Sequence, residues 1–325
     1  MPCGDPSQPR ATLTAMPTLR VATYNLYLGA DLTLVFGVAD EADLVERARQ
    51  VHDEAVGTDF AARAAAVAAI LVREGVDVVG LQEVARWQVA EPGRAPEVRC
   101  DFLAELTGAL EREGAPYDVH AVNPNFGGSA PLPDGRLLGV DGRNVVLVRR
   151  GSGVRVLEER CGTFDAVLHV PTGLAGTSFR VPRSCGWVDA ELDGARFRFV
   201  NTHTEAWDAG VRDAQRDQLL SAVGEPGVPV VLVGDLNAGP AEVGMPAGYV
   251  DAWAVAGGPG PGWTCGQAAD LANPESALDS RIDYVWVRDA AVTACRVVGD
   301  QPSDRTSVAK LWPSDHAGVV AEVLL

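Results

Sequence analysis

The sequence predicts an α+β protein: a four-layer α/β/β/α sandwich in which two mixed, largely antiparallel sheets pack face to face between outer helices. Three observations support this prediction. Short apolar runs rich in β-branched residues recur along the chain, long helical patterns lie between them, and the two kinds of segment do not strictly alternate. With 325 residues, 47% of them hydrophobic, the chain can build one large core. We therefore expect a single domain over residues 18–325.

Eight apolar runs are predicted to be strands, because each is short and most carry several β-branched residues. They are Leu19–Asn25, Val76–Glu83, Asn144–Arg149, Val188–Leu192, Phe197–His203, Val230–Asp235, Ile282–Val287 and Val319–Leu324. Asp193 and Gly194 separate the fourth run from the fifth, and this dipeptide favours a tight hairpin turn. These two runs are therefore expected to form an antiparallel hairpin.

Three segments have helical patterns. The first covers roughly Asp40–Glu74 with a break near Gly57, the second Cys100–Glu113 and the third Gly210–Val223. In the second, apolar residues recur at the three- and four-residue spacing that places them on one helix face. We expect these helices to lie outside the sheets.

Three further segments are predicted to lack regular structure. Residues 1–17 are rich in Pro, Ser, Thr and Gly and resemble a disordered leader. Two further stretches are rich in Gly and Pro: Asn123–Gly142 and Ala256–Pro274. The second predicted loop is also taken as Gly257–Ser280. Loops of this length in a compact domain are usually functional rims or disordered.

The six cysteines form no CxxC pair, so the sequence does not predict a structural zinc site. Pairings of Cys161 with Cys185 and of Cys265 with Cys295 are open alternatives. The chain shows no signal-peptide pattern, which favours reduced thiols and a cytoplasmic location. No apolar run is long enough to span a membrane.

The formal net charge is −17, and Lys and Arg are not clustered. A protein that binds long nucleic acids normally presents a basic face, because neutralising phosphates supplies most of the non-specific affinity. The charge therefore disfavours nucleic acid as a partner. It also disfavours attachment to an anionic membrane surface.

Polar side chains stand where the predicted strands end. They are Asn25, Glu83, His203, Asp235, Asn237, Asp283 within its strand, and the Asp315-His316 pair just before the last strand. In Gly234-Asp235-Leu236-Asn237, alternation along a strand would aim Asp235 and Asn237 the same way. Taken singly, each residue also has an ordinary role as a cap, a first solvated residue or a hydrogen-bonded core histidine. Their recurrence at one strand end after another favours a common site.

These residue types suit the hydrolysis of a phosphoester, whose anionic oxygens repel a nucleophile. The catalyst must neutralise that charge and deprotonate water. Glu83 and an Asp from another strand can hold Mg²⁺ or Mn²⁺, which prefer oxygen ligands. Histidines can donate protons to phosphoryl oxygens, and Asp283 beside one of them would raise its pKa.

With these residues the chain resembles the endonuclease/exonuclease/phosphatase superfamily, which includes deoxyribonucleases, abasic-site endonucleases, inositol polyphosphate 5-phosphatases and neutral sphingomyelinases. Matching motifs occur in the family's order and cover nearly everything from Thr18 to Leu325. They are Tyr24-Asn25, Gln82-Glu83, Arg143-Asn144, Thr202-His203, Gly234-Asp235-Leu236-Asn237, Arg281-Ile282-Asp283-Tyr284 and Ser314-Asp315-His316.

The resemblance implies a role for each residue. Glu83 would be the principal metal ligand, with Asn25 beside it and Asp235 and Asp315 as further metal contacts. Asp235 with Asn237 would position or activate the attacking water.

His316, supported by Asp283, would act as general base or would stabilise the phosphate. Asn144 and Arg143 would contact the scissile phosphate. The histidine at His203 resembles the deoxyribonuclease, sphingomyelinase and inositol-phosphatase branches more than the abasic-site endonucleases.

The sequence thus predicts a Mg²⁺- or Mn²⁺-dependent phosphohydrolase. The expected substrate is a phosphodiester of a small molecule or a lipid headgroup. A nuclease acting on DNA or RNA is the alternative within the enzyme class. A non-catalytic binding module that retains the fold is the alternative from another class.

Overall fold

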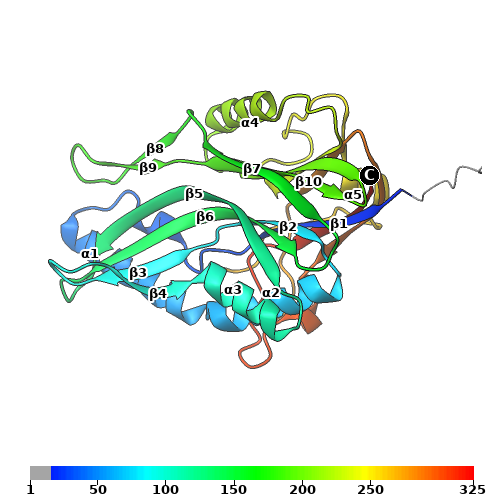
Figure 1. Ribbon diagram of the computed structural model, residues 1–325. Coiled ribbons are helices and arrows are strands. Elements are labelled where there is room, and N and C mark those ends of the chain that lie inside the picture. The colour runs from blue at the N-terminus through cyan, green and yellow to red at the C-terminus, as the bar shows by residue number, and fades with distance from the viewer. Residues whose placement is uncertain (1–15) are drawn as a thin grey trace, which may run out of the picture.

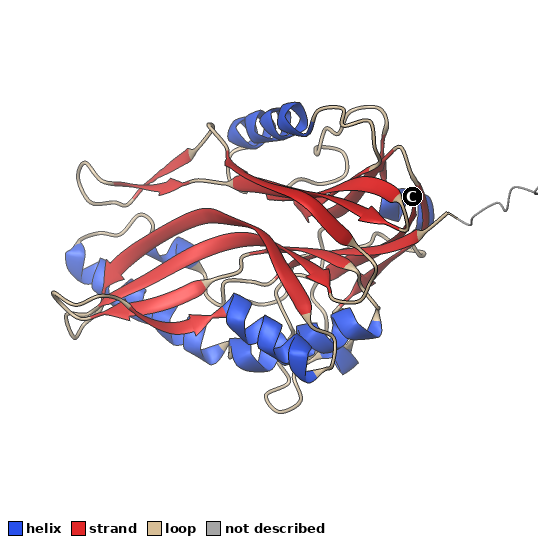
Figure 2. Ribbon diagram, viewed as in Figure 1, coloured by secondary structure: helices blue, strands red, loops and turns tan. Residues whose placement is uncertain are grey.

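The computed structural model describes residues 16–325, so all but the last two residues of the predicted leader lie outside the described part. Two large sheets pack against each other, and helices cover their outer faces (Figures 1 and 2). The α+β sandwich predicted from the sequence is confirmed.

The first sheet contains eight strands: β1 (Thr18–Asn25), β2 (Val78–Gln82), β3 (Arg86–Ala90), β4 (Glu97–Asp101), β5 (Tyr117–Pro131), β6 (Leu137–Arg149), β15 (Ala291–Val298) and β16 (Gly318–Leu324). Their order is β15-β16-β1-β2-β6-β3-β4, with β5 paired to β6. β1 and β2 run parallel and the remaining pairs run antiparallel.

The second sheet contains six strands: β7 (Arg155–Thr163), β10 (Ser184–Leu192), β11 (Ala195–His203), β12 (Val230–Asp235), β13 (Tyr249–Asp251) and β14 (Asp283–Arg288). Their order is β13-β14-β12-β11-β10-β7, and only β11 and β12 are parallel. The predicted hairpin of β10 and β11 is confirmed: Leu192 pairs with Ala195 across a turn whose two residues, Asp193 and Gly194, both have positive φ. A separate small hairpin consists of β8 (Leu168–Pro171) and β9 (Ser178–Val181).

Five α-helices and two short 3₁₀ helices occur in the described residues: α1 (Glu41–Gly57), α2 (Phe60–Arg73), α3 (Phe102–Arg112), α4 (Ala209–Val223), α5 (Ala252–Ala256), η1 (Leu32–Val35) and η2 (Pro302–Asp304). The break expected near Gly57 separates α1 from α2, where Asp59 caps α2 through the Ala62 N–H. Helices α1 to α3 cover the first sheet and α4 covers the second (Figure 1).

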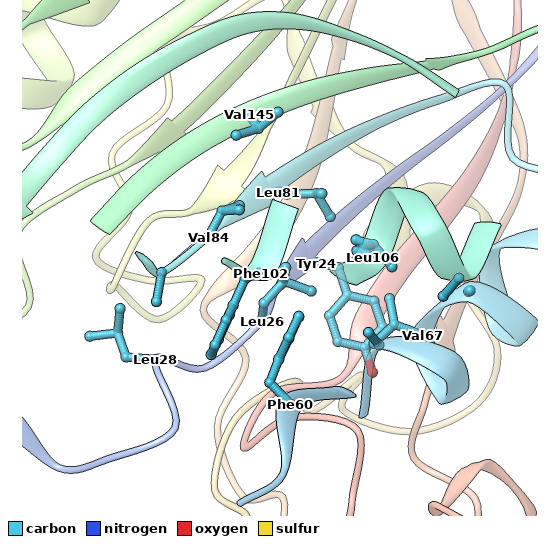
Figure 3. Packing of buried hydrophobic residues seen from close by; sticks show 14 of the residues in the cluster. Tyr24, Leu26, Leu28, Phe60, Val67, Leu81, Val84, Phe102, Leu106 and Val145 are labelled. Carbon is cyan, nitrogen blue, oxygen red and sulfur yellow. The ribbon is translucent and has the colours of Figure 1, made fainter. Parts of the chain in front are cut away.

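Each central strand is buried on both faces, which produces three packed interfaces. On β1, Val21 contributes to the core between the sheets, whereas Tyr24 packs under the helices. On β12, Val231 faces the first sheet and Leu232 faces α4. Figure 3 shows the interface between the first sheet and its helices, where the rings of Phe60 and Phe102 stack. This two-sided burial explains why the sequences of these strands are continuous apolar runs.

Near the strand ends the two sheets are also joined by buried amides. Asn201 of β11 donates to the carbonyls of Leu81 and Val145 in the facing sheet, at 3.0 Å each, and accepts from Gln82 at 2.7 Å. Gly80 permits this approach, because a Cβ there would lie 2.7 Å from the Asn201 oxygen. The contact fixes β2 against β11 just before the ends that carry Glu83 and His203.

The prediction of a loop over Asn123–Gly142 was wrong, since these residues form most of the β5–β6 hairpin. Its prolines and glycines suggested irregular structure. However, β5 pairs only with β6, and an edge strand tolerates Pro because its outward N–H need not donate. Irregularities between His120 and Asn123 and between Pro124 and Gly127 accommodate the remaining interruptions. The second predicted loop, 257–280, contains only isolated bridges at Cys265 and Ser280.

Cys100, Cys161, Cys185, Cys265 and Cys295 are free thiols, and Cys3 lies outside the described residues. The two disulfide pairings considered from the sequence are therefore not formed. No single helix in residues 16–325 is long and apolar enough to cross a membrane. The bent pair of α1 and α2 together has that length and composition, with a 46° bend between the two helices.

Candidate active site

A cleft opens where β1, β2, β11 and β12 end and where the segment before β16 approaches them. Its volume is about 1080 Å³, open side included. Six of the residues predicted from the sequence line it: Glu83, His203, Asp235, Asn237, Asp315 and His316. We call it the strand-end cleft. The strand register helps to assemble it, because His203 pairs with Asp235 across β11–β12 and Asp235 pairs with Asp283 across β12–β14.

The Asn25 amide holds two carboxylates together at one wall of the cleft. Its nitrogen donates to Glu83 at 3.2 Å and to Asp235 at 3.0 Å, while its oxygen accepts from the Tyr27 N–H at 2.9 Å. Glu83 also accepts from the Leu28 N–H at 2.8 Å. In this geometry Asn25 orients the carboxylates.

Three residues that line the cleft have left-handed backbones, Tyr27 with φ 55° among them. Such backbones are uncommon for non-glycine residues and often mark functional sites. Glu83 has φ 53° directly after β2, and Asn237 has φ 48° two residues after β12. β12 ends at Asp235, so strand alternation does not reach Asn237. Asn237 lines the cleft because its backbone N–H donates to Asp235 at 2.9 Å and its side chain donates to the Thr204 carbonyl.

His316 and Asp283 form a buried pair behind the cleft. Nδ1 of His316 lies 2.8 Å from the Asp283 carboxylate, and Nε2 lies 3.8 Å from Asp235 and 3.9 Å from Asp315. Burial alone would lower the pKa of His316, but the charges of Asp283 and Asp315 outweigh it and raise the pKa well above its usual value. Ser314 fixes this segment to β1 by donating to the Asn25 carbonyl at 2.7 Å. These contacts favour the protonated imidazolium of His316, and its Nε2 faces the cleft.

His203 has the opposite electrostatic environment. Its Nε2 lies 3.6 Å from Asp235, and the guanidinium of Arg183 lies 3.3 Å away. Burial first, and then the charges of Arg183 and His316, lower its pKa well below the usual value. The surroundings therefore shift the two histidine pKa values in opposite directions, which favours His316 as an acid and His203 as a neutral hydrogen-bonding group.

Arg183 was not identified from the sequence. It precedes β10, lines the cleft and is only 6% exposed. Its Nε lies 3.6 Å from Glu205, and neither that Nε nor the facing Glu205 oxygen has a hydrogen-bond partner. Because this guanidinium lines the cleft, it is suited to bind an anion such as phosphate there. The available sequence signal was a lone arginine directly before a buried strand.

The structure does not bring Arg143 and Asn144 into the cleft. The Arg143 guanidinium pairs with Asp101 at 2.5 Å and donates to the carbonyls of Val84 and Ala85. The Asn144 amide is buried, and its nitrogen donates to Ser184 at 3.1 Å. Both side chains contact neighbouring segments from the middle of β6, and Arg183 is the arginine that lines the cleft.

The carboxylates of the cleft fit a hard divalent cation. Asp235, Asp283 and His316 lie close enough to share an ion, but the Asp283 oxygen facing His316 is already hydrogen-bonded to it. Burial, and then the charge of Asp283, raise the pKa of Asp235 to about 7. Burial also raises the pKa of Asp315 to about 6, with Glu83 adding to the effect and His316 opposing it. Crowded oxygen ligands of this kind are those that Mg²⁺ and Mn²⁺ prefer.

Comparison with known proteins identifies the same architecture. A model of the Endonuclease/Exonuclease/phosphatase family matches residues 22–316. No match was found among curated proteins. A solved endonuclease/exonuclease/phosphatase family protein from Bacteroides thetaiotaomicron is 21% identical, with a TM-score of 0.60 and coverage of 94% of this chain and 95% of that one.

Two further solved structures are similar to this chain. Truncated TDP2 from Caenorhabditis elegans is 19% identical, with a TM-score of 0.56 and coverage of 95% of this chain and 98% of that one. The mannosyl-6-phosphatase of Bacteroides thetaiotaomicron is 20% identical, with a TM-score of 0.58 and coverage of 94% and 100%. At these identities the likeness shows a shared fold.

Proposed function

Because the chain belongs to the endonuclease/exonuclease/phosphatase family and is a metal-dependent hydrolase of phosphoesters, we propose that its substrate is a phosphodiester of a small molecule or a lipid headgroup. The observation that carries this proposal is the strand-end cleft, where carboxylates, a charged imidazole, a neutral imidazole and a buried guanidinium converge. The proposed metal is Mg²⁺ or Mn²⁺.

Glu83, Asp235 and Asp315 would hold the cation, and Asn25 would keep the first two in place. When bound, the cation neutralises phosphate charge and makes water more acidic. Arg183 would bind a phosphate oxygen through its guanidinium, which lines the cleft.

The attacking water would lie between Asp235 and Asn237. Asp235 would accept the water's proton through the carboxylate oxygen that does not hold the cation. Nε2 of the protonated His316 would donate to a phosphoryl oxygen as charge develops on it, and Asp283 holds the ring in that orientation. The neutral His203 would supply a second hydrogen bond without repelling Arg183.

The charge of the whole chain supports a small substrate over a nucleic acid. At −17 the protein would repel a polyanion at long range, and Arg183 supplies one local positive charge in the cleft. A single phosphodiester needs only that local charge and the cation.

The test is hydrolysis of bis(p-nitrophenyl) phosphate, p-nitrophenyl phosphate and plasmid DNA, each with Mg²⁺, Mn²⁺ or EDTA. We expect metal-dependent cleavage with the aryl diester preferred. Asp235→Ala should reduce the rate by about 10³-fold or more while the protein stays folded. Asp217→Ala, an exposed carboxylate on α4, is the matched control and should retain full activity.

A fully active Asp235→Ala protein would overturn the mechanism. Preferred cleavage of plasmid DNA would replace the small-molecule diesterase with a nuclease. Preferred cleavage of the monoester would make the enzyme a phosphatase. Cation binding without any turnover would favour a non-catalytic binding module.

A further inference from the structure

A second hollow, which we call the apolar pocket, lies beside the strand-end cleft. The β5–β6 hairpin forms one wall, with Phe126, Gly128 and Val140, and β9 contributes Phe179 to the opposite wall. The space inside it, open side included, is about 560 Å³. Figure 1 shows the β8–β9 hairpin standing over β5 and β6, and β9 contacts β5.

The walls of this pocket are almost entirely hydrocarbon. Among the described residues that line it, Arg180 alone carries a charge and Ser129 alone carries a hydroxyl. Aromatic rings stand on several sides, and the rest of the lining is aliphatic or glycine. A sugar or a nucleobase here would leave hydroxyl or amide groups without partners, which is costly. An alkyl or acyl chain would leave none.

The apolar pocket and the strand-end cleft adjoin. Leu32, Phe36, Phe126 and Val181 line both. Phe36 stands at the junction: its ring lies 5.4 Å from that of Phe179 and meets Trp207 edge-on at 5.7 Å. Trp207 lines the cleft and is 54% exposed. One molecule can therefore occupy both spaces, with its phosphate in the cleft and an apolar group past Phe36.

The pocket is also anchored. The backbone N–H of Val38, just beyond Phe36, donates to the Thr172 carbonyl at 2.8 Å in the turn of the β8–β9 hairpin. A Cβ at Gly173 would collide with the Val38 backbone, so this turn and the segment after η1 pack directly on each other. The hairpin that carries Phe179 is thus held in place, which lowers the entropic cost of binding.

We propose that the apolar pocket binds the alkyl or acyl chain of the phosphodiester substrate, which makes the preferred substrate a lipid-like diester. This inference rests on the proposed function and refines it. Continuity with the strand-end cleft and the hydrocarbon lining carry the argument.

Gly128 offers a direct test. A Cβ there would meet only a ring carbon of Phe179, at 3.9 Å, and its φ lies outside the left-handed region. Gly128→Leu should therefore fold and fill the pocket. Gly162→Leu is the matched control, because Gly162 lies on β7 with nothing within 4 Å of its added Cβ and does not line either space. Phe179→Ser is a second variant that removes one wall instead of filling the space.

The substrates are p-nitrophenyl hexyl phosphate and p-nitrophenyl methyl phosphate, which share a leaving group and differ only in alkyl length. For the wild type we expect kcat/KM for the hexyl diester to exceed that for the methyl diester by at least about tenfold. Gly128→Leu should bring that ratio close to one with the methyl diester within about twofold of wild type, and Phe179→Ser should lower it. Gly162→Leu should keep the wild-type ratio.

Calorimetry with hexylphosphonate and methylphosphonate separates this inference from the proposed function. The wild type should bind hexylphosphonate at least about tenfold more tightly, and Gly128→Leu should lose that preference. If neither diester is cleaved but this pattern holds, the diesterase proposal fails and the apolar pocket stands. Equal binding of the two phosphonates by the wild type, or a chain-length preference that survives in Gly128→Leu, overturns the inference and leaves the pocket to another occupant, such as a side chain of a protein partner.

Discussion

Arg63 holds together two chain segments of the candidate active site, although it touches no residue predicted to act on substrate. It is fully buried under the first sheet and donates to four backbone carbonyls: Thr58, Leu26, Pro313 and Tyr27, at 2.9, 2.6, 3.0 and 3.2 Å. Leu26 and Tyr27 follow Asn25, and Pro313 precedes the Ser314-Asp315-His316 segment. Burial lowers the pKa of Arg63 to about 10, which leaves it charged at neutral pH.

Arg63→Met removes the donors and keeps an unbranched side chain beside the stacked rings of Phe60 and Phe102. Each charge-assisted hydrogen bond contributes roughly 1.5–3 kcal/mol, so the four together contribute about 6–12 kcal/mol. Returning the guanidinium to water in the unfolded state recovers several kcal/mol of desolvation cost. We therefore expect a net loss of about 3–5 kcal/mol and a fall in Tm on the order of 10 °C.

The assay is thermal and urea unfolding followed by circular dichroism, with kcat/KM measured well below Tm. Activity should fall at least about tenfold in the folded variant, because small displacements of catalytic groups are costly. Arg49→Met, an exposed helix arginine with surface ion pairs, is the control and should leave Tm nearly unchanged. A free energy of unfolding for Arg63→Met within about 1 kcal/mol of wild type would refute the reasoning, because four buried carbonyls would then have found other partners.

Three further predictions concern the active site and the thiols. Asp283→Asn should lower kcat by about 10²–10⁴-fold. It should also shift the pH–rate profile to lower pH, because removing the Asp283 charge lowers the pKa of His316. An unchanged profile would exclude this role. Mn²⁺ at about 100 times its Kd should stabilise the wild type by about 2.7 kcal/mol and raise its Tm. Glu83→Ala should reduce this rise in Tm. An equal rise in both proteins would place the cation elsewhere. Burial raises the pKa of Cys185 and Cys295 to about 12. Among the cysteines that the structure describes, alkylation of the native protein at pH 8 should therefore modify the exposed Cys161 first and should reach these two buried thiols only on unfolding. Peptide mass spectrometry would show this order, and rapid labelling of Cys185 would contradict the burial.

The predicted strands and helices were those whose local pattern and tertiary environment agree. β1 and β12 are buried on both faces, so their sequences are continuously apolar and end abruptly at Asn25 and Asp235. The polar residue at the end of such a strand is visible in the sequence because the apolar run before it is so uniform. The motifs at these strand ends also occur in the order typical of the family, and this order predicted that the strand ends meet in a common cleft.

Strands at the edges of the sheets were not predicted, because little in their sequences differs from a loop. β7 is exposed along nearly its whole length, and β5 contains Pro124 and Pro131. Pairing with a single neighbour supplies their backbone hydrogen bonds, so the side chains carry no periodic signal.

The sequence by itself determined the layers of the fold and the set of chemical groups that the cleft collects, because apolar runs and polar strand ends are local properties of the chain. Only the tertiary structure decided which arginine faces the cleft, since Arg143 is held by Asp101 and Arg183 is left beside His203. It also decided the opposite pKa shifts of His203 and His316 and the apolar pocket beside the cleft. These features depend on distances between residues far apart in the chain, and such distances exist only after the two sheets have packed.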